Sequence, residues 1–217
     1  MALEVAVIGG HGKIALRLLR LLSERGDRAR GLIRNPDHAA DVEATGATAV
    51  GADIENMDAD GLARSIAGVD AVVFAAGAGA GSGPARKHTV DYGGAVKLIE
   101  AARMNDVSRY LMVSAIGANH PEGWSDEMRP YYEAKAQADA ELTDSGLEYT
   151  IVRPGGLTDD PGTGMVSAAE DLGRYGRIPR DDVAATLLGC LDEPGTIRKA
   201  FDLLAGETPI GEALAAL

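Results

Sequence analysis

The chain begins with a short apolar run that leads directly into glycines, Val5-Ala6-Val7-Ile8-Gly9-Gly10-His11-Gly12-Lys13-Ile14-Ala15, and this stretch decides the fold. Residues 5–8 are typical of a buried parallel strand, and the apolar positions after the glycines recur at helical spacing. The glycines permit a tight turn between strand and helix, and the small Ala15 lets the two elements pack closely. The pattern Gly9-x-x-Gly12-x-x-Ala15 therefore predicts the strand–turn–helix unit that binds dinucleotides.

The same turn predicts which groups contact the cofactor pyrophosphate. Free N–H groups at the start of a helix face the phosphates, and the helix dipole adds a positive field behind them. Two alternatives remain open, because a glycine-rich turn can serve close packing alone and His11 can be a solvent-facing loop residue. We expect the contacts of the turn to come from Gly9, Gly10, His11, Gly12, Lys13 and Ile14.

The end of the second predicted strand favours one nicotinamide cofactor over the other. An NAD site usually has Asp or Glu there to bind the ribose diol, whereas this chain has Gly31-Leu32-Ile33-Arg34-Asn35 and no acid before Asp37. A guanidinium at Arg34 suits a 2′-phosphate, which only NADP carries. The sequence thus predicts NADP rather than NAD, with an ordinary surface arginine as the alternative interpretation of Arg34.

Apolar runs and helical patterns alternate along the rest of the chain. We expect strands at 29–33, 47–51, 71–74, 109–113 and 148–152, and helices at 36–44, 58–67, 90–104 and 132–145. This alternation predicts an α/β, Rossmann-like, doubly wound parallel sheet with helices on both faces. After Pro154 the pattern is irregular, with a helix at 181–191, a strand near 200–204 and a closing helix at 209–216. We expect one NAD(P)-binding domain over 1–217, with about 155–217 forming a small C-terminal cap on the substrate side.

Composition narrows the possible partners. The 217 residues include 21 Lys and Arg against 33 Asp and Glu, a net charge of −12, and 4% aromatics. Such a balance argues against nucleic acid or an anionic membrane as the main partner, and few aromatics disfavour single-stranded nucleic acid. No apolar run approaches the length of a membrane span, and the N-terminus does not resemble a signal peptide. A small-molecule substrate is the expected partner.

The metal and redox chemistry of the side chains is limited. Cys190 is the single cysteine, so no intrachain disulfide or cysteine cluster is expected. The histidines at 11, 38, 88 and 120 lack metal-ligand spacing, and we expect no metal site. A reducing cytoplasmic location fits this cysteine content.

Several motifs resemble the short-chain dehydrogenase/reductase superfamily. These are the glycine turn, Asp53-Ile54, Ala75-Ala76-Gly77 and Tyr149-Thr150-Ile151-Val152-Arg153-Pro154-Gly155. The chain is most similar to the atypical NAD(P)H-binding subgroup described as NAD-dependent epimerase/dehydratase-like, over nearly its whole length. The resemblance implies that Asp53 and Ile54 lie against adenine and Pro154 near the nicotinamide. It further implies that Ala75, Ala76 and Gly77 line the ribose and pyrophosphate, although a helix N-terminal acid at Asp53 and close packing at 75–77 are alternatives.

The resemblance also implies a catalytic set. Tyr131 and Lys135 form a Tyr-x-x-x-Lys motif whose members share a helical face, and Ser114 ends the fifth predicted strand. In the superfamily the lysine holds the nicotinamide ribose and lowers the tyrosine pKa, the tyrosine exchanges a proton with the substrate, and the serine binds the reacting oxygen. Asp91 stands where the superfamily has asparagine, and a carboxylate cannot donate a hydrogen bond unless it is protonated. Tyr131 as a mere cofactor contact or packing aromatic is the alternative.

Three functions follow, in order of preference. The first is an NADP-dependent oxidoreductase that transfers hydride between NADPH and a small carbonyl, quinone or flavin-like acceptor. The second is a non-catalytic NADP(H)-binding redox sensor or regulatory protein, which Asp91 motivates. The third is a nucleotide-sugar epimerase or dehydratase, for which the residues after Pro154 are too few to build a full sugar-nucleotide site. Helices at 90–104 and 132–145 often form a dimer face in this superfamily, so a homodimer is an open possibility.

Overall fold

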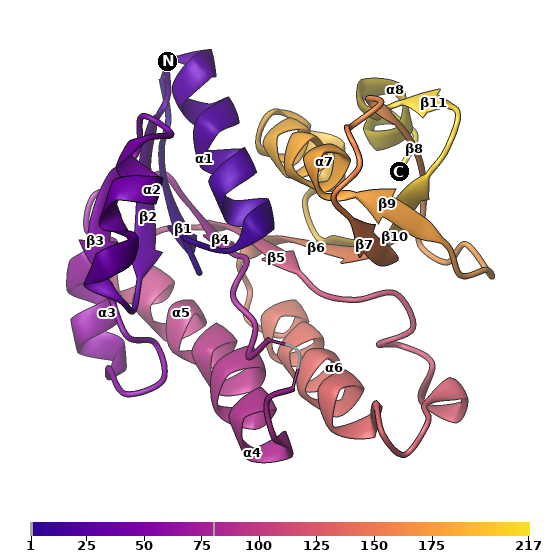
Figure 1. Ribbon diagram of the computed structural model, residues 1–217, viewed down its shortest axis with the longest axis horizontal. Coiled ribbons are helices and arrows are strands. Elements are labelled where there is room, and N and C mark those ends of the chain that lie inside the picture. The colour runs from indigo at the N-terminus through magenta and orange to yellow at the C-terminus, as the bar shows by residue number, and fades with distance from the viewer. Residues whose placement is uncertain (1, 80) are drawn as a thin grey trace.

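A nine-stranded sheet forms the centre of the structure, a computed structural model that describes residues 2–79 and 81–217. Its strand order is β11-β8-β10-β6-β5-β4-β1-β2-β3 (Figure 1). The first six strands in the sequence are all parallel: β1 (Glu4–Ile8), β2 (Arg28–Ile33), β3 (Thr48–Gly51), β4 (Ala71–Phe74), β5 (Arg109–Val113) and β6 (Glu148–Pro154). This 3-2-1-4-5-6 order confirms the predicted Rossmann-like fold.

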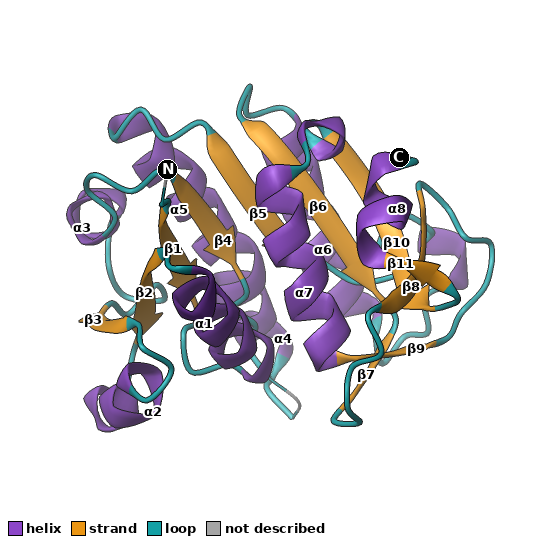
Figure 2. Cartoon of the chain, turned by 90° about the horizontal axis from the view of Figure 1, so that it is seen from above, coloured by secondary structure: helices purple, strands orange, loops and turns teal. Residues whose placement is uncertain are grey.

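Helices cover both faces of the sheet (Figures 1 and 2). One face carries α1 (Lys13–Arg25), α2 (Ala39–Glu43), α7 (Arg180–Asp192) and α8 (Ile210–Ala215), and the other carries α3 (Ala59–Ser65), α5 (Gly93–Met104) and α6 (Arg129–Thr143). Alternate strand residues supply the two apolar layers, because successive side chains of a strand point to opposite faces. Val5 and Val7 pack with α1, whereas Ala6 and Ile8 pack with α3 and α5.

The chain reverses its direction of winding at β1, and this reversal positions a ligand site. From β1 the chain continues through α1 to β2 on one side, and β4 pairs with β1 on the other side. The loops that follow β1 and β4 therefore diverge at the carboxyl edge of the sheet. A crevice at such a switch point is where open α/β sheets bind their ligands.

The C-terminal region contains strands that the sequence did not predict, so the expected irregular segment is wrong there. β7 (Gly156–Thr158) and β9 (Arg177–Pro179) form a separate parallel pair. β8 (Met165–Ala169) and β11 (Thr208–Pro209) add antiparallel pairing at the sheet edge. β8 lies beside β10 (Lys199–Ala205), which is the strand predicted near 200–204 and joins β6 in parallel. Strands this short carry too few residues for a period-two pattern, and partners distant in the sequence stabilise them.

Several helix boundaries also differ from the expected ones. The predicted helix at 36–44 is a 3₁₀ turn, Pro36–His38, followed by α2. A short helix α4 (Pro84–Lys87) and a π-helical turn (His88–Tyr92) precede α5, and α6 starts early enough to include Tyr131. Within 2–79 and 81–217, no helix has both the length and the apolar character that crossing a membrane requires.

Candidate nucleotide pocket and active site

The glycine turn lies unusually close to two neighbouring strands. Gly9 has φ of +80°, and a Cβ at this position would lie 2.7 Å from Cα of Ala76, in the loop after β4. A Cβ at Gly10 would lie 2.7 Å from the carbonyl carbon of Gly31 in β2. Larger residues would therefore push the turn away from both strands, and glycine is required for close approach rather than for flexibility alone.

Helix α1 starts at this turn with its positive end uncovered by side chains. Gly12 is the N-cap residue, no side chain caps the first turn, and that turn contains no acidic residue. The Gly12 N–H donates to the Gly9 carbonyl at 2.7 Å, which closes the turn below the helix. Such a helix start presents N–H donors and a positive field to an anion, as a pyrophosphate requires.

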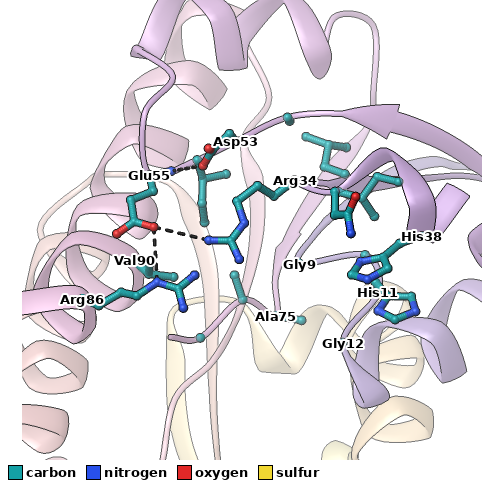
Figure 3. Close-up of a pocket in the computed structure, with 18 residues that line it drawn as sticks. Gly9, His11, Gly12, Arg34, His38, Asp53, Glu55, Ala75, Arg86 and Val90 are labelled. Carbon is teal, nitrogen blue, oxygen red and sulfur yellow. Dashed lines mark hydrogen bonds and ion pairs between the residues drawn. The ribbon is translucent and has the colours of Figure 1, made fainter. Parts of the chain in front are cut away.

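A pocket of about 320 Å³ lies over this turn at the carboxyl edge of β1, β2 and β4 (Figure 3). Ten residues that the sequence assigns to the cofactor line it: Gly9, Gly10, His11, Gly12, Arg34, Asp53, Ile54, Ala75, Ala76 and Gly77. Further lining residues, which the sequence did not single out, include Asn35, His38, Glu55, Arg86 and Val90. A cradle that any Cβ at Gly9 or Gly10 would fill, beside an uncapped helix start, fits a dinucleotide cofactor.

Two arginines converge on one carboxylate at one side of the pocket (Figure 3). Arg34 Nη1 lies 3.5 Å and Arg86 Nε 3.3 Å from Glu55 Oε2, and Thr89 Oγ1 donates to Glu55 Oε1 at 2.8 Å. The Thr89 hydrogen bond and then the two arginines lower the pKa of Glu55 below its usual value. Neither Glu55 nor Arg86 belongs to a sequence motif: Glu55 lies after β3, and Arg86 lies on α4. Their approach to Arg34 arises only in the folded chain.

The carboxylate of Asp53 closes a turn at the end of β3. It accepts the Glu55 backbone N–H at 3.1 Å and the Asn56 amide at 2.9 Å. Burial alone would raise the pKa of Asp53, but these hydrogen bonds lower it. The N-cap of α3 is instead Asp58, which accepts the Gly61 N–H at 2.8 Å, so Asp53 is not the helix-capping acid of the alternative interpretation.

His11 lies at the opposite side of the pocket in a stacked pair (Figure 3). Its ring stacks on His38 with centroids 3.6 Å apart, and its Nε2 lies 2.7 Å from Asp41 Oδ2 on α2. His38 and Asp41 therefore fix the His11 ring at the edge of the glycine turn. Its side chain lines the pocket rather than facing solvent alone.

Four residues assigned to the cofactor, Lys13, Ile14, Lys135 and Pro154, lie outside the lining of this pocket. Lys13 Nζ lies 2.5 Å from Asp159 Oδ2, in the segment after β7, and the Ile14 side chain is part of the apolar layer under α1. Pro154 is buried at the end of β6, where its carbonyl accepts the Ile116 N–H at 3.0 Å. Lys13 and Ile14 can still contribute backbone N–H groups, because both belong to the first turn of α1.

Tyr131 and Lys135 lie one turn apart on α6, and Lys135 reaches β5. Lys135 is buried, its Nζ donates to the Val113 carbonyl at 3.0 Å, and its Nζ lies 3.3 Å from Asp91 Oδ1. Asp91 is buried in the π-helical turn, and its Oδ2 accepts the Ala78 N–H at 3.0 Å. The residue that departs from the superfamily pattern is thus the counter-ion of Lys135.

Ser114 follows directly on the residue that Lys135 contacts. Its N–H donates to the Val152 carbonyl at 2.8 Å, which extends the β5–β6 pairing by one residue. The side chain is buried, and within the described residues Oγ makes no hydrogen bond apart from an interaction with the Asp139 carboxylate that lowers the pKa of that carboxylate. A buried hydroxyl in this condition is rare, and it marks a place where a ligand can complete the hydrogen bonding.

The local charges set the protonation of Tyr131 and Lys135. Burial raises the pKa of Tyr131, Lys135 lowers it, and Asp91 and Asp139 raise it, with a net rise above the ordinary value. Burial alone would lower the pKa of Lys135, but Tyr131 and Asp91 raise it. At neutral pH the site therefore holds a neutral phenol beside an ammonium.

Comparison with known proteins agrees with this geometry. Residues 9–194 match the model of an NAD(P)H-binding family. The Bacillus subtilis protein YhfK, named as an uncharacterized sugar epimerase, is 46% identical over 213 residues, which cover 98% of this chain and 99% of that protein.

Two further relatives extend the comparison. A Bacillus halodurans structure, provisionally described as an NAD-dependent epimerase/dehydratase, superposes with a TM-score of 0.94 at 36% identity and covers 100% of both chains. Sanguinarine reductase from Eschscholzia californica is 31% identical over 131 residues, covering 57% of this chain and 48% of that protein. The chain belongs to the NAD(P)H-binding family, in the atypical subgroup of short-chain dehydrogenases/reductases that contains epimerase-like and reductase-like proteins.

Proposed function

We propose that the protein is an NADPH-dependent reductase of small carbonyl, quinone or flavin-like acceptors. The observation that carries the proposal is the buried hydroxyl of Ser114, which among the described residues interacts only with the Asp139 carboxylate of α6 and follows directly on the residue that Lys135 contacts. A reacting oxygen that accepts a hydrogen bond from Ser114 would complete the bonding of that hydroxyl. The name of sanguinarine reductase supports a reductive chemistry for this family.

NADP is the proposed cofactor because two guanidinium groups meet at the ribose end of the pocket. Arg34 and Arg86 both contact Glu55, so both point to one place. A 2′-phosphate brings more negative charge than a carboxylate and pairs bidentately with arginine. Glu55 leaves an NAD-binding alternative, because its carboxylate could accept the ribose hydroxyls instead.

The protonation state of Tyr131 favours reduction of the acceptor over oxidation of an alcohol. A bound NADPH nicotinamide would supply the hydride and become NADP⁺. Tyr131, neutral at pH 7 because burial raises its pKa, can give its proton to the oxygen that receives the negative charge. The phenolate that remains lies near the Lys135 ammonium and regains its proton from solvent.

The Lys135 ammonium has an N–H donor that makes no hydrogen bond within residues 2–79 and 81–217 and can bind the cofactor. Its ammonium has three N–H groups, of which one binds the Val113 carbonyl and another faces Asp91. The remaining donor can bind a nicotinamide ribose hydroxyl. Asp91 would then act as a positioning residue that keeps the ammonium charged and fixed.

The test is turnover of NADPH by the wild-type protein and by Tyr131→Phe over a panel of quinones, flavins and small ketones. We expect the variant to lose about a hundredfold to ten-thousandfold in turnover, the usual contribution of a general acid, while its Kd for NADPH stays within twofold. Tyr132→Phe, the adjacent tyrosine, is the matched control and should retain turnover. Unchanged turnover in Tyr131→Phe would remove its role as proton donor.

A non-catalytic NADP(H)-binding protein is the second candidate, and the buried Asp91–Lys135 pair favours it. A lysine held on two sides by the protein can serve cofactor binding and stability without chemistry. Tight NADPH binding with no oxidation by any acceptor would support this function. Exchange of a sugar-nucleotide epimer without net cofactor oxidation would instead support the epimerase alternative.

A further inference from the structure

A second cavity of about 330 Å³ lies apart from the nucleotide pocket. Its walls are the segment 116–123 after β5, the segment 171–175 after β8, and Asp202 of β10. The first wall begins with Ile116, two residues after Ser114 in the sequence, and Ser114 itself does not line the cavity. No residue of this cavity also lines the nucleotide pocket among the residues that the structure describes.

Asp202 is the polar group that is least explained by the fold. It is 2% exposed, in the middle of the apolar strand β10, and it lines the cavity. Oδ2 accepts the Leu172 N–H at 3.1 Å, but Oδ1 has no hydrogen-bond partner. The neighbouring cation in the β6–β10 register, Arg153, donates through Nε to Asp139 at 2.9 Å. A buried carboxylate oxygen without a donor costs stability, so a role in ligand binding is expected.

The rest of the cavity is negative as well. Glu122, Asp171 and Asp202 line it against one guanidinium, Arg174, which donates to Ser167 Oγ at 3.2 Å. His120 also lines the cavity, with its ring nitrogens 3.4 Å from Glu122 Oε1 and 3.4 Å from Asp171 Oδ2. Leaving the histidine out, three carboxylates and one guanidinium give a formal charge of 1 − 3 = −2 on the lining. Negative walls around a partly desolvated carboxylate attract cations and repel anions.

An aromatic ring stands at the same cavity. Tyr175 is 67% exposed, and its hydroxyl lies beside Gly117, whose φ of +85° favours glycine at that position of the wall. Aromatic faces attract cationic groups, and carboxylates with aromatic rings are how proteins bind quaternary ammonium groups. The cavity thus combines carboxylates with an aromatic ring, and both groups attract cations.

We propose that this cavity binds the acceptor through a positively charged nitrogen, an ammonium or quaternary ammonium group, with Asp202 as the counter-ion. That the bound molecule is the hydride acceptor rests on the proposed function. The charge preference of the cavity does not, because it follows from the lining alone. Asp202 acts here as a specificity residue, at a distance from the reacting oxygen.

The first test needs no cofactor and no variant. Three para-substituted acetophenones differ in charge: 4-(trimethylammonio)acetophenone is cationic, 4-tert-butylacetophenone is neutral and has the same shape, and 4-acetylbenzoate is anionic. Their Kd values are measured by calorimetry on the whole chain. Trp124, the single tryptophan, provides a local fluorescence signal because its Nε1 donates to the Gly117 carbonyl at 2.8 Å. We expect the cation to bind about tenfold more tightly than the neutral ketone and the anion to bind more weakly. Equal Kd values for the three ketones would overturn the proposal.

The second test assigns the preference to Asp202. Asp202→Asn keeps an oxygen that can accept the Leu172 N–H and removes the charge, and we expect the cationic preference to fall to about twofold or less. Asp182→Asn is the matched control, because Asp182 is equally buried but its oxygens accept the N–H groups of Thr163 and Gly164, outside the cavity. It should keep the tenfold preference. A preference that survives in Asp202→Asn would overturn the role of Asp202.

The two proposals can fail separately. A charge preference that depends on Asp202, together with no NADPH oxidation by any quinone, flavin or ketone of the panel, would contradict the reductase function and support the cavity as a cation site. NADPH oxidation that depends on Tyr131, together with equal binding of the three ketones, would contradict the cation site and support the reductase function.

Discussion

The polar groups of the nucleotide pocket differ from those on the side of α6 and β10 in how fully they are hydrogen-bonded. In the nucleotide pocket, Glu55 contacts two arginines and a threonine, and His11 contacts Asp41. On the side of α6 and β10, in the described part of the chain, Asp202 Oδ1 is buried without a hydrogen bond, and Ser114 Oγ and Asp139 Oδ1 are buried with no partner other than each other. The pocket is therefore preorganised by contacts within the protein, whereas the side of α6 and β10 keeps polar atoms that the fold satisfies poorly. Such atoms, rather than a motif, indicate where a second ligand binds.

Asp91 lies between these two regions, and its loss should have the largest effect. Asp91→Ala leaves the Lys135 ammonium buried without its counter-ion, and we expect a loss of about 3 kcal/mol in the free energy of unfolding. Urea unfolding measures this loss. Asp91→Asn keeps an oxygen that can accept from Ala78 or Lys135, and it should lose clearly less. Equal stability of Asp91→Ala and the wild type would mean that the pair does not hold Lys135.

Arg34→Ala should remove one of the two arginine contacts to Glu55 in the nucleotide pocket. The variant removes one of two guanidinium groups at the expected 2′-phosphate position, and we expect its affinity for NADPH to fall about thirtyfold, as for the loss of a charged hydrogen bond. Its affinity for NADH should change little, because NADH has no 2′-phosphate. Calorimetric titration with both cofactors gives the ratio. An unchanged preference for NADPH over NADH would exclude Arg34 as the selecting residue.

Glu55→Gln should change the affinity for NADPH in the opposite direction and by a smaller factor. Removing the carboxylate frees Arg34 and Arg86 from their partner, and we expect severalfold tighter binding of NADPH. If Glu55 instead binds the ribose hydroxyls, the same variant should weaken NADH and leave NADPH unimproved. The sign of the change thus separates the two cofactor assignments.

We expect the smallest effect from Asp202→Asn, which changes the thermal stability of the protein. Burial raises the pKa of Asp202 in the folded chain, so the folded state is favoured at low pH and loses this advantage as pH rises through the raised pKa. Asp202→Asn does not ionise, and we expect its Tm to exceed that of the wild type by about 2 °C at pH 7. The difference should shrink as pH falls toward 4. Thermal unfolding followed by circular dichroism checks it, and a constant difference across this range would contradict an ionised Asp202.

Sequence patterns predicted the alternating strands and helices. They missed the features that depend on contacts between residues far apart in the sequence. Strands β1 to β6 follow from apolar runs that alternate with helices, and the glycine turn follows from spacing. Glu55 and Arg86 give no such signal, because a loop and a short helix bring them together only after the sheet has formed. Asp202 did leave a trace: a single acid inside an apolar strand, Ala200-Phe201-Asp202-Leu203-Leu204, is unusual enough to mark a functional position.

The place of β10 in the sheet has a consequence for synthesis on the ribosome. β10 pairs with β6, but the chain must add the residues between 154 and 199 before this pairing can begin. At about 5–20 residues per second, the β6 edge stays open for several seconds in every newly made chain. The finished sheet has no comparable edge among its described strands, since it ends in the four-residue β3 and in the two-residue β11, which contains Pro209. Aggregation during translation is therefore a greater hazard for this fold than aggregation of the mature protein.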